Sequence, residues 1–295
     1  MNLAELNKVA LALVAPGKGL LAADESGGTI KKRFDAINVE STADSRRDYR
    51  ELLFRTQDAM QNAISGVILF DETIGQAAAD GTPLVRLIEQ AGTIPGIKVD
   101  EGTQDLPQCP GELVTAGLDR LAARLADYYR QGARFAKWRA VIDVSRGSDG
   151  GPIPSMAAIA VNAHALARYA ALCQAAQIVP IVEPEVLMDG DHDIDRCVEV
   201  TQRVLNKTFQ ELRLQRVALE GMILKPNMAI SGKKCATQAD VGEVAEKTVR
   251  MLKACVPAAV PGIAFLSGGQ SDIDATAHLD AMNKIGNLPW RLTFS

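Results

Sequence analysis

The sequence has few cysteines and few histidines, the residue types that build disulfide frameworks and many zinc sites. Its 295 residues include five cysteines and three histidines. The cysteines are odd in number, and no two of them form a C-x-x-C pair. This pattern argues against a disulfide framework or zinc site and favours reduced thiols in the cytosol. We therefore expect a cytoplasmic protein.

One segment carries residue types that bind metals, Asp189-Gly190-Asp191-His192-Asp193. The other two histidines, His164 and His278, are far from it in the sequence and form no cluster. We interpret the segment as the capped start of a helix, and we expect neither a metal nor another cofactor.

An excess of basic charge and long apolar runs are also absent. The formal net charge is −4 and the sequence pI is about 5.5, so there is no global basic footprint for nucleic acid or an anionic membrane. No stretch reaches the roughly 18 apolar residues needed to span a bilayer. The segment Met1–Ala15 carries Glu5 and Lys8 in its apolar pattern, which makes it a poor signal peptide. We expect a soluble protein that binds neither nucleic acid nor membrane.

Short apolar stretches alternate with amphipathic helical patterns along the chain. The first helical pattern places Leu3, Leu6, Ala10 and Leu13 on one face and stops at Pro16-Gly17. Eight apolar stretches are typical of strands: 19–23, 66–70, 94–100, 133–139, 178–183, 219–228, 262–267 and 289–295. No Ser-rich or Pro-rich linker divides the chain.

This alternation predicts a parallel sheet covered by helices. Eight units predict a single closed (β/α)8 TIM barrel over residues 1–295, with a helix in residues 1–15 packed on the barrel. An open, doubly wound sheet is the alternative. It is disfavoured because no G-x-G-x-x-G motif follows the first predicted strand.

Charged or polar residues end most of the predicted strands. In a parallel barrel the carboxyl ends of the strands meet at one mouth, where catalytic groups gather. The residues at these ends are Asp24, Asp71, Lys98, Lys137, Glu183, Lys225 and Ser267. For any one of them, a solvated rim of ion pairs is the alternative interpretation. Together they predict a polar site at the mouth.

Two lysines and two carboxylates in this set suit carbonyl chemistry. Lys225 ends a buried apolar run, where a lysine either reaches towards solvent or is paired or deprotonated. A second cation, Lys137, would lower the pKa of the first and free an amine to attack a carbonyl carbon. Glu183 and Asp24 would then move protons to and from the carbinolamine and a substrate hydroxyl.

Two glycine-rich turns have the form of phosphate cradles. Ser267-Gly268-Gly269-Gln270-Ser271 follows a predicted strand and opens a helix, so its backbone N–H groups can bind an anion. Ser26-Gly27-Gly28-Thr29 is the second, with Lys31, Lys32 and Arg33 behind it. Each turn alone is a weak signal. Two of them suggest a substrate with two phosphates.

Six motifs resemble those of one family in order and in position. They are Leu21-Ala22-Ala23-Asp24-Glu25-Ser26, Gly96-Ile97-Lys98-Val99-Asp100, Phe135-Ala136-Lys137-Trp138-Arg139, Val182-Glu183-Pro184-Glu185, Leu224-Lys225-Pro226-Asn227-Met228 and Phe265-Leu266-Ser267-Gly268-Gly269-Gln270-Ser271. The chain resembles class I fructose-1,6-bisphosphate aldolase along essentially its whole length. That family reversibly cleaves fructose 1,6-bisphosphate to dihydroxyacetone phosphate and glyceraldehyde 3-phosphate, in glycolysis and gluconeogenesis.

The resemblance implies a role for each catalytic candidate. Lys225 is implied as the Schiff-base lysine that attacks C2, and Glu183 as the acid and base of carbinolamine dehydration. Lys137 is implied as an assisting cation, and Asp24 as the acceptor of the C4 hydroxyl proton.

The resemblance also implies the substrate contacts. Ser267, Gly268 and Gly269 form the C1 phosphate cradle, whereas Ser26, Lys98 and Arg33 lie toward the C6 phosphate. Arg139 joins the same binding network. Family members are commonly tetramers and sometimes smaller, so we expect a homo-oligomer, a tetramer or a dimer.

The sequence departs from the family pattern in two places. Glu101 stands where a lysine is usual. The sequence also stops at the predicted eighth strand, where the family continues with a Tyr-Gly-Arg-Ala-Leu-type loop, a last helix and a tail. We therefore expect a longer natural gene product and impaired turnover by the 295-residue form.

Two rival functions remain open at this point. One is another Schiff-base barrel, such as a transaldolase-like transferase; the paired phosphate cradles favour the bisphosphate over it. The other is a non-catalytic scaffold on an aldolase barrel, against which the set of Asp24, Lys137, Glu183 and Lys225 argues.

Overall fold

An eight-stranded parallel sheet forms the centre of the molecule. The computed structural model describes residues 1–144 and 153–295. In spatial order the strands are β1 (Gly19–Ala23), β2 (Ile64–Leu69), β3 (Ile94–Lys98), β6 (Phe135–Ile142), β7 (Val179–Val186), β8 (Ile223–Leu224), β9 (Gly262–Phe265) and β10 (Arg291–Phe294). Every pair of neighbours in this order is parallel. The sheet curls into a nearly closed barrel, which confirms the predicted fold class.

The two outer strands of the order, β1 and β10, meet through side chains. Within the described ranges no backbone ladder joins them. Instead, the Thr293 hydroxyl donates to the Lys18 carbonyl over 2.6 Å. The Phe294 ring lies where a Cβ on Gly19 would stand, with ring atoms at 2.6 Å from that point. Only glycine at the start of β1 allows this approach.

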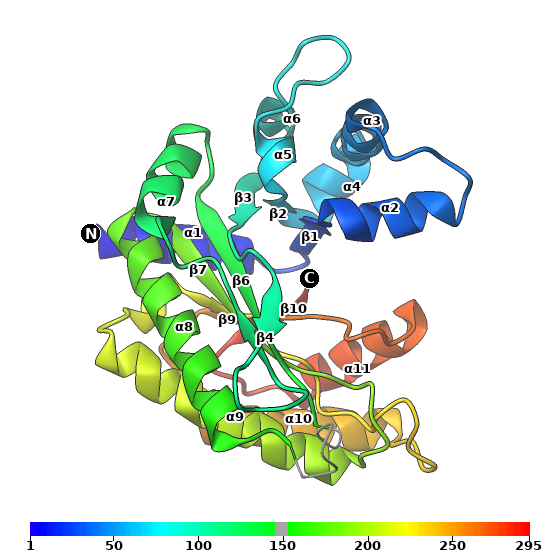
Figure 1. Ribbon diagram of the computed structural model, residues 1–295, viewed down its shortest axis with the longest axis vertical. Coiled ribbons are helices and arrows are strands. Elements are labelled where there is room, and N and C mark those ends of the chain that lie inside the picture. Colours follow the sequence, from blue (N-terminus) through cyan, green and yellow to red (C-terminus); the bar gives the residue numbers. More distant parts are fainter. Residues whose placement is uncertain (145–152) are drawn as a thin grey trace.

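Helices surround the sheet, with α2, α3 and α4 beside β1 and β2 (Figure 1). The helices are α1 (Leu3–Leu13), α2 (Gly27–Asp35), α3 (Ala43–Phe54), α4 (Gln57–Asn62), α5 (Asp71–Ile74), α6 (Leu84–Gln90), α7 (Leu121–Arg130), α8 (Met156–Ala175), α9 (Ile194–Leu214), α10 (Val241–Cys255) and α11 (Asp272–Ile285). A short antiparallel hairpin, β4 (Thr103–Asp105) with β5 (Leu113–Thr115), was not predicted. Its strands are too short to give a hydrophobic period.

The predicted boundaries of three strands are wrong. The stretch 219–228 contains a 3-10 turn, Leu219–Gly221, and only the two-residue strand β8. Strands β6 and β7 continue past Lys137 and Glu183 by several residues. These two side chains therefore project from within their strands, because the β6–β7 ladder pairs residues up to Ile142 and Val186.

Helix α1 packs against the interior of the barrel. Its buried Leu6, Ala10 and Leu13 join one apolar cluster with residues from β1, β2, β6, β7, β8 and β9. The close approach requires a small residue at the start of β9, because a Cβ on Gly262 would lie 2.5 Å from Val14. The apolar pattern of residues 3–13 thus supplies one end of the barrel core.

Among the described residues one helix, α8, is long and apolar enough to cross a membrane, judged on length and composition alone. We did not expect a helix of this kind from the sequence. In the fold, 56% of its apolar window is buried. Its Tyr169 hydroxyl donates to the carbonyls of Ala136 in β6 and Ile181 in β7, at 2.7 and 3.2 Å. These contacts are those of a core helix.

Gly96 in β3 gives a test of the barrel core. A Cβ at this position would lie 2.3 Å from ring atoms of Phe135 in β6. We expect Gly96→Ala to lower the free energy of unfolding by roughly 1–3 kcal/mol, the usual cost of overpacking a core. Urea unfolding followed by circular dichroism measures it.

The matched control is Gly28→Ala in α2, where an added Cβ meets no atom within 4 Å. Alanine there improves helix propensity by up to about 1 kcal/mol, so no loss of stability is expected. Equal unfolding midpoints for the two variants would contradict the packing of Phe135 on Gly96.

Candidate active site

Five charged side chains, three within strands and two directly after strands, converge inside the mouth of the barrel. Asp24 directly follows β1, Lys98 ends β3, and Lys137 lies in β6. Glu183 lies in β7, and Lys225 directly follows β8. The parallel register pairs Lys98 with Lys137 across β3 and β6. The strands therefore bring these five residues together, as the sequence predicted.

The two buried lysines share one carboxylate. Lys225 Nζ donates to Glu183 Oε1 over 2.5 Å, and Lys137 Nζ lies 3.4 Å from Glu183 Oε2. Lys225 is 6% exposed, Lys137 is 5% exposed and Glu183 is 2% exposed. The Lys137 contact has an ion-pair distance but not hydrogen-bond geometry, so Oε2 receives no hydrogen bond from the described residues. Glu183 thus keeps one oxygen available to accept a proton.

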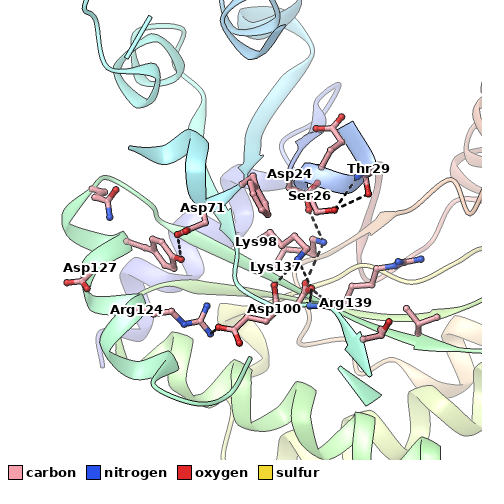
Figure 2. Close-up of a pocket in the computed structure, with 18 of the residues that line it drawn as sticks. Asp24, Ser26, Thr29, Asp71, Lys98, Asp100, Arg124, Asp127, Lys137 and Arg139 are labelled. Carbon is pink, nitrogen blue, oxygen red and sulfur yellow. Dashed lines mark hydrogen bonds and ion pairs between the residues drawn. The ribbon is translucent and has the colours of Figure 1, made fainter. Parts of the chain in front are cut away.

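Lys137 contacts two further carboxylates (Figure 2). Its Nζ lies 2.8 Å from Asp24 Oδ2 and 3.9 Å from Asp100 Oδ2. Burial alone would lower the pKa of Lys137, but the carboxylates of Glu183, Asp24 and Asp100 outweigh it and raise the pKa. The sequence argument from two lysines left out these three carboxylates, which keep Lys137 charged. Lys137 is a fixed ammonium.

The same contacts hold Asp24 in its charged form. Burial acts to raise the pKa of the Asp24 carboxyl. Attraction to Lys137, a hydrogen bond from Lys137 and weaker attraction to Lys225 and Lys98 together exceed that effect, and the pKa lies below its usual value. Asp24 is thus a carboxylate beside a permanent cation.

Asp100 belongs to the site although the sequence analysis did not single it out as a site residue. Lys98 Nζ donates to the Asp100 backbone carbonyl over 2.7 Å and forms an ion pair with Asp100 Oδ1, also at 2.7 Å. Asp100 Oδ2 accepts from the backbone N–H of Arg139 over 3.3 Å. Asp100 closes the third predicted strand, two residues after Lys98, and that spacing was the available signal.

Arg139 points from β6 toward the same mouth. Its Nε donates to Glu185 Oε2 in β7, and its side chain is 43% exposed. In the sequence, Glu185 stands out only as the last residue of the motif Val182-Glu183-Pro184-Glu185. This pair leaves the outer part of the guanidinium open to a ligand.

A cavity of about 920 Å³ opens beside these residues. The predicted site residues that line it are Asp24, Ser26, Arg33, Asp71, Lys98, Lys137 and Arg139. Ser26 caps α2, since its Oγ accepts from the Thr29 N–H over 3.4 Å. Arg33 pairs with Glu25 over 2.5 Å and is 60% exposed. The second glycine-rich turn therefore faces the cavity with the capped start of α2 and a largely exposed cation.

Asp71, unlike the other charged residues at the strand ends, is bonded to a tyrosine of a surrounding helix. Tyr128 in α7 donates its hydroxyl to Asp71 Oδ1 over 2.5 Å. Burial, with the bond to Asp71, raises the pKa of Tyr128 to about 12. In Figure 2, Asp71 lies on the far side of the cavity from Arg139.

The first glycine-rich turn lies between β9 and α11. Gly268 and Gly269 have φ of +62° and +87°, which glycine adopts without strain. Ser271 caps α11, and the Leu266 N–H donates to the carbonyl of Pro226 over 3.2 Å. That bond places the turn beside the strand end that carries Lys225. The turn is not part of the cavity lining described above.

The segment 189–193 begins a helix, as predicted. Asp193 is the N-cap of α9, with its side chain accepting from the Arg196 N–H over 2.8 Å. Among the described residues, no group of three His, Cys, Asp or Glu side chains is arranged to hold a metal ion.

Comparisons with known proteins agree on one family. The profile described as "Fructose-bisphosphate aldolase class-I" matches residues 5–295. A probable fructose-bisphosphate aldolase class 1 of Xanthomonas campestris pv. campestris is 58% identical over 295 residues, which are 100% of this chain and 86% of that protein. Fructose-bisphosphate aldolase 1 of Toxoplasma gondii is 54% identical, over 99% of this chain and 79% of its own length.

A solved structure extends the comparison to the fold. It is the fructose-bisphosphate aldolase from Plasmodium falciparum in complex with TRAP and a small-molecule inhibitor. It matches this structure with a TM-score of 0.95 and 47% sequence identity, over 99% of this chain and 83% of that one.

The ion pair of Lys137 and Asp24 predicts a change in pH dependence. In the native protein the lowered pKa of Asp24 contributes stability above about pH 3.9, the pKa of an unfolded aspartate. That contribution is lost as the pH falls through the lowered folded pKa. In Lys137→Met, burial is opposed only by Lys225 and Lys98, and we expect the pKa of Asp24 to lie above its usual value.

The sign of the contribution then reverses. The Lys137→Met protein should lose stability as the pH rises from about 4 to 7, because the folded state holds a proton that the unfolded state has released. Urea midpoints across this range measure the slope, with Lys137→Met/Asp24→Asn as the control that lacks the titrating group. Parallel slopes for the two variants would refute the assignment to Asp24.

Proposed function

Since the chain belongs to the class I fructose-bisphosphate aldolase family, whose members are carbon–carbon lyases, we propose that Lys225 forms a Schiff base with the ketose substrate. The reaction of the family is the reversible cleavage of fructose 1,6-bisphosphate to dihydroxyacetone phosphate and glyceraldehyde 3-phosphate. The observation that carries the proposal is the buried contact of Lys225 Nζ with Glu183 Oε1, at 2.5 Å. A nucleophile beside its own base is the geometry that covalent catalysis requires.

Glu183 moves the protons of Schiff-base formation. It takes a proton from the Lys225 ammonium, and the free amine attacks C2 of the ketose to give a carbinolamine. Glu183 then returns a proton to the C2 hydroxyl, which leaves as water and gives the iminium. The second carboxylate oxygen, which receives no hydrogen bond from the described residues, supports this exchange.

Asp24 and Lys137 act at the next step. Asp24 accepts the proton of the C4 hydroxyl, the C3–C4 bond breaks, and the aldehyde leaves. The electron pair of that bond passes into the iminium, which becomes an enamine. A carboxylate kept charged by Lys137 suits a proton acceptor, and the fixed Lys137 ammonium also stabilises negative charge near the substrate. Because the iminium is the electron sink, we propose that no metal or other cofactor takes part.

Two anion sites would hold the ends of the bisphosphate. We assign the C1 phosphate to Ser267, Gly268 and Gly269, whose turn is bonded to the Lys225 strand end through Leu266 and Pro226. We assign the C6 phosphate to the wall formed by Ser26, Lys98 and Arg33, with Arg139 in the substrate-binding network. The joint presence of these four residues in the cavity lining supports that assignment.

We further propose that the protein works in the cytoplasm as a homo-oligomer, a tetramer or a dimer. Relatives include a cytosolic fructose-bisphosphate aldolase of Arabidopsis thaliana, 53% identical over 95% of this chain. Light scattering after size-exclusion chromatography tests the assembly.

Trapping of the covalent intermediate tests the mechanism. Incubation with dihydroxyacetone phosphate and borohydride should leave a stable adduct on Lys225, located by peptide mapping. Lys225→Ala should abolish the adduct, and EDTA should leave turnover unchanged. Lys284→Ala is the control, because Lys284 is an exposed lysine paired with Asp280. An adduct that persists in Lys225→Ala would refute the proposal that Lys225 forms the Schiff base.

Glu183→Gln tests the acid and base separately. It removes proton transfer but keeps a side chain of nearly the same size, so we expect turnover to fall by about 100-fold or more with substrate binding retained. Isothermal titration with the bisphosphate measures binding, and a coupled assay measures turnover. Turnover within a few-fold of the parent protein would show that another group moves these protons.

A further inference from the structure

Arg50 is a fully buried arginine whose function the site described above does not account for. It lies in α3 and is 0% exposed. Arginine is rarely buried unless it is paired, because removing a cation from water is costly. Here the carboxylate contact is weak, since Arg50 Nη2 lies 3.5 Å from Glu25 Oε2. Other contacts must therefore compensate for the burial of this guanidinium.

The shortest hydrogen bonds of Arg50 go to backbone carbonyls. Its Nε donates to the Ala23 carbonyl over 3.1 Å, and its Nη2 donates to the Glu25 carbonyl over 3.0 Å. A longer bond of 3.5 Å joins Nη1 to the Arg46 carbonyl in the same helix. The guanidinium thus binds the chain one residue before and one residue after Asp24.

These two bonds act where β1 ends and α2 has not yet begun. Asp24 lies between Ala23, the last residue of β1, and Ser26, the cap of α2. Its carboxylate meets Lys137 at 2.8 Å from this short connection. A connection without a ladder or a helix of its own has few bonds to fix its backbone, and Arg50 supplies two of them.

The need to fill space would not by itself require a guanidinium. An apolar side chain of similar length would fill the same space without the cost of burying a charge. Arginine offers instead a rigid fork of N–H donors that can bind two acceptors at once, which lysine cannot reproduce. The two acceptors chosen here flank the proposed proton acceptor.

We propose that Arg50 is a positioning residue that holds Asp24 in place for cleavage of the C3–C4 bond. The proposal rests on the proposed function, in which Asp24 takes the C4 hydroxyl proton. Displacement of a reacting group by about 1 Å can cost 100-fold in rate. Loss of Arg50 should therefore slow bond cleavage, whereas Schiff-base formation, which depends on Lys225 and Glu183, should continue.

The experiment compares Arg50→Met and Arg50→Lys with the parent protein in two assays. Cleavage of fructose 1,6-bisphosphate should lose kcat by about 100-fold in Arg50→Met and by about tenfold in Arg50→Lys, with KM nearly unchanged. Borohydride trapping of dihydroxyacetone phosphate on Lys225 should proceed as in the parent protein. A merely structural role would lower both readouts together, in proportion to the folded fraction.

Arg46→Met is the matched control. Arg46 lies one turn earlier in α3, and its guanidinium pairs with Glu72 through a 2.8 Å contact to Oε2. Its side chain bonds to Glu72 and Ser41, and no hydrogen bond or ion pair among the described residues joins it to Ala23, Asp24 or Glu25. Arg46→Met should therefore keep the kcat of the parent protein. If Arg50→Met does not fold, Arg50→Lys and the Arg46→Met control decide the question.

A double-mutant cycle tests whether Arg50 acts through Asp24. On an Asp24→Asn background, Arg50→Lys should reduce kcat by less than about twofold further, because the two changes disable the same step. Independent, multiplying losses would overturn the proposal, as would a parent-like kcat in Arg50→Lys. Failure of the parent protein itself to form the Lys225 adduct would refute the proposed function instead, so the two failures are distinguishable.

Discussion

The active site depends on the burial of one ammonium group, that of Lys137. It is stable there because carboxylates reach it from three other parts of the barrel: Asp24 after β1, Asp100 after β3, and Glu183 in β7. An unpaired charge at this depth would cost several kcal/mol. The barrel therefore has to bring these segments together for Lys137 to be buried at all, and in doing so it assembles the proposed proton-transferring groups around Lys225.

Much of this arrangement could be predicted from the sequence. A parallel barrel sends successive strand ends to one mouth, so Asp24, Lys98, Lys137, Glu183 and Lys225 could be expected to meet once the alternating pattern was recognised. The cap at Asp193 followed from residue type and position in the same way. These are local signals, and the fold combines them by a rule that holds for every barrel.

Other features could not be predicted, because they depend on contacts between distant segments. The argument from two neighbouring lysines did not count the three carboxylates around Lys137, which raise its pKa. Arg50 resembles Arg46 and Arg47 in the sequence, yet of the three it alone reaches the carbonyls beside Asp24. The boundary errors at 219–228 arose because a 3-10 turn and a strand can share one apolar run.

The position of α1 has a consequence for the order of folding. This helix precedes in the chain every strand that buries it, and those strands are spread between Leu20 and Ala264. During synthesis its apolar face stays exposed to water until most of the barrel has been made. Contacts this far apart in sequence form slowly, and unburied apolar surface is a target for aggregation and for chaperones. A helix made before all the strands that bury it is thus among the last elements to find its native partners.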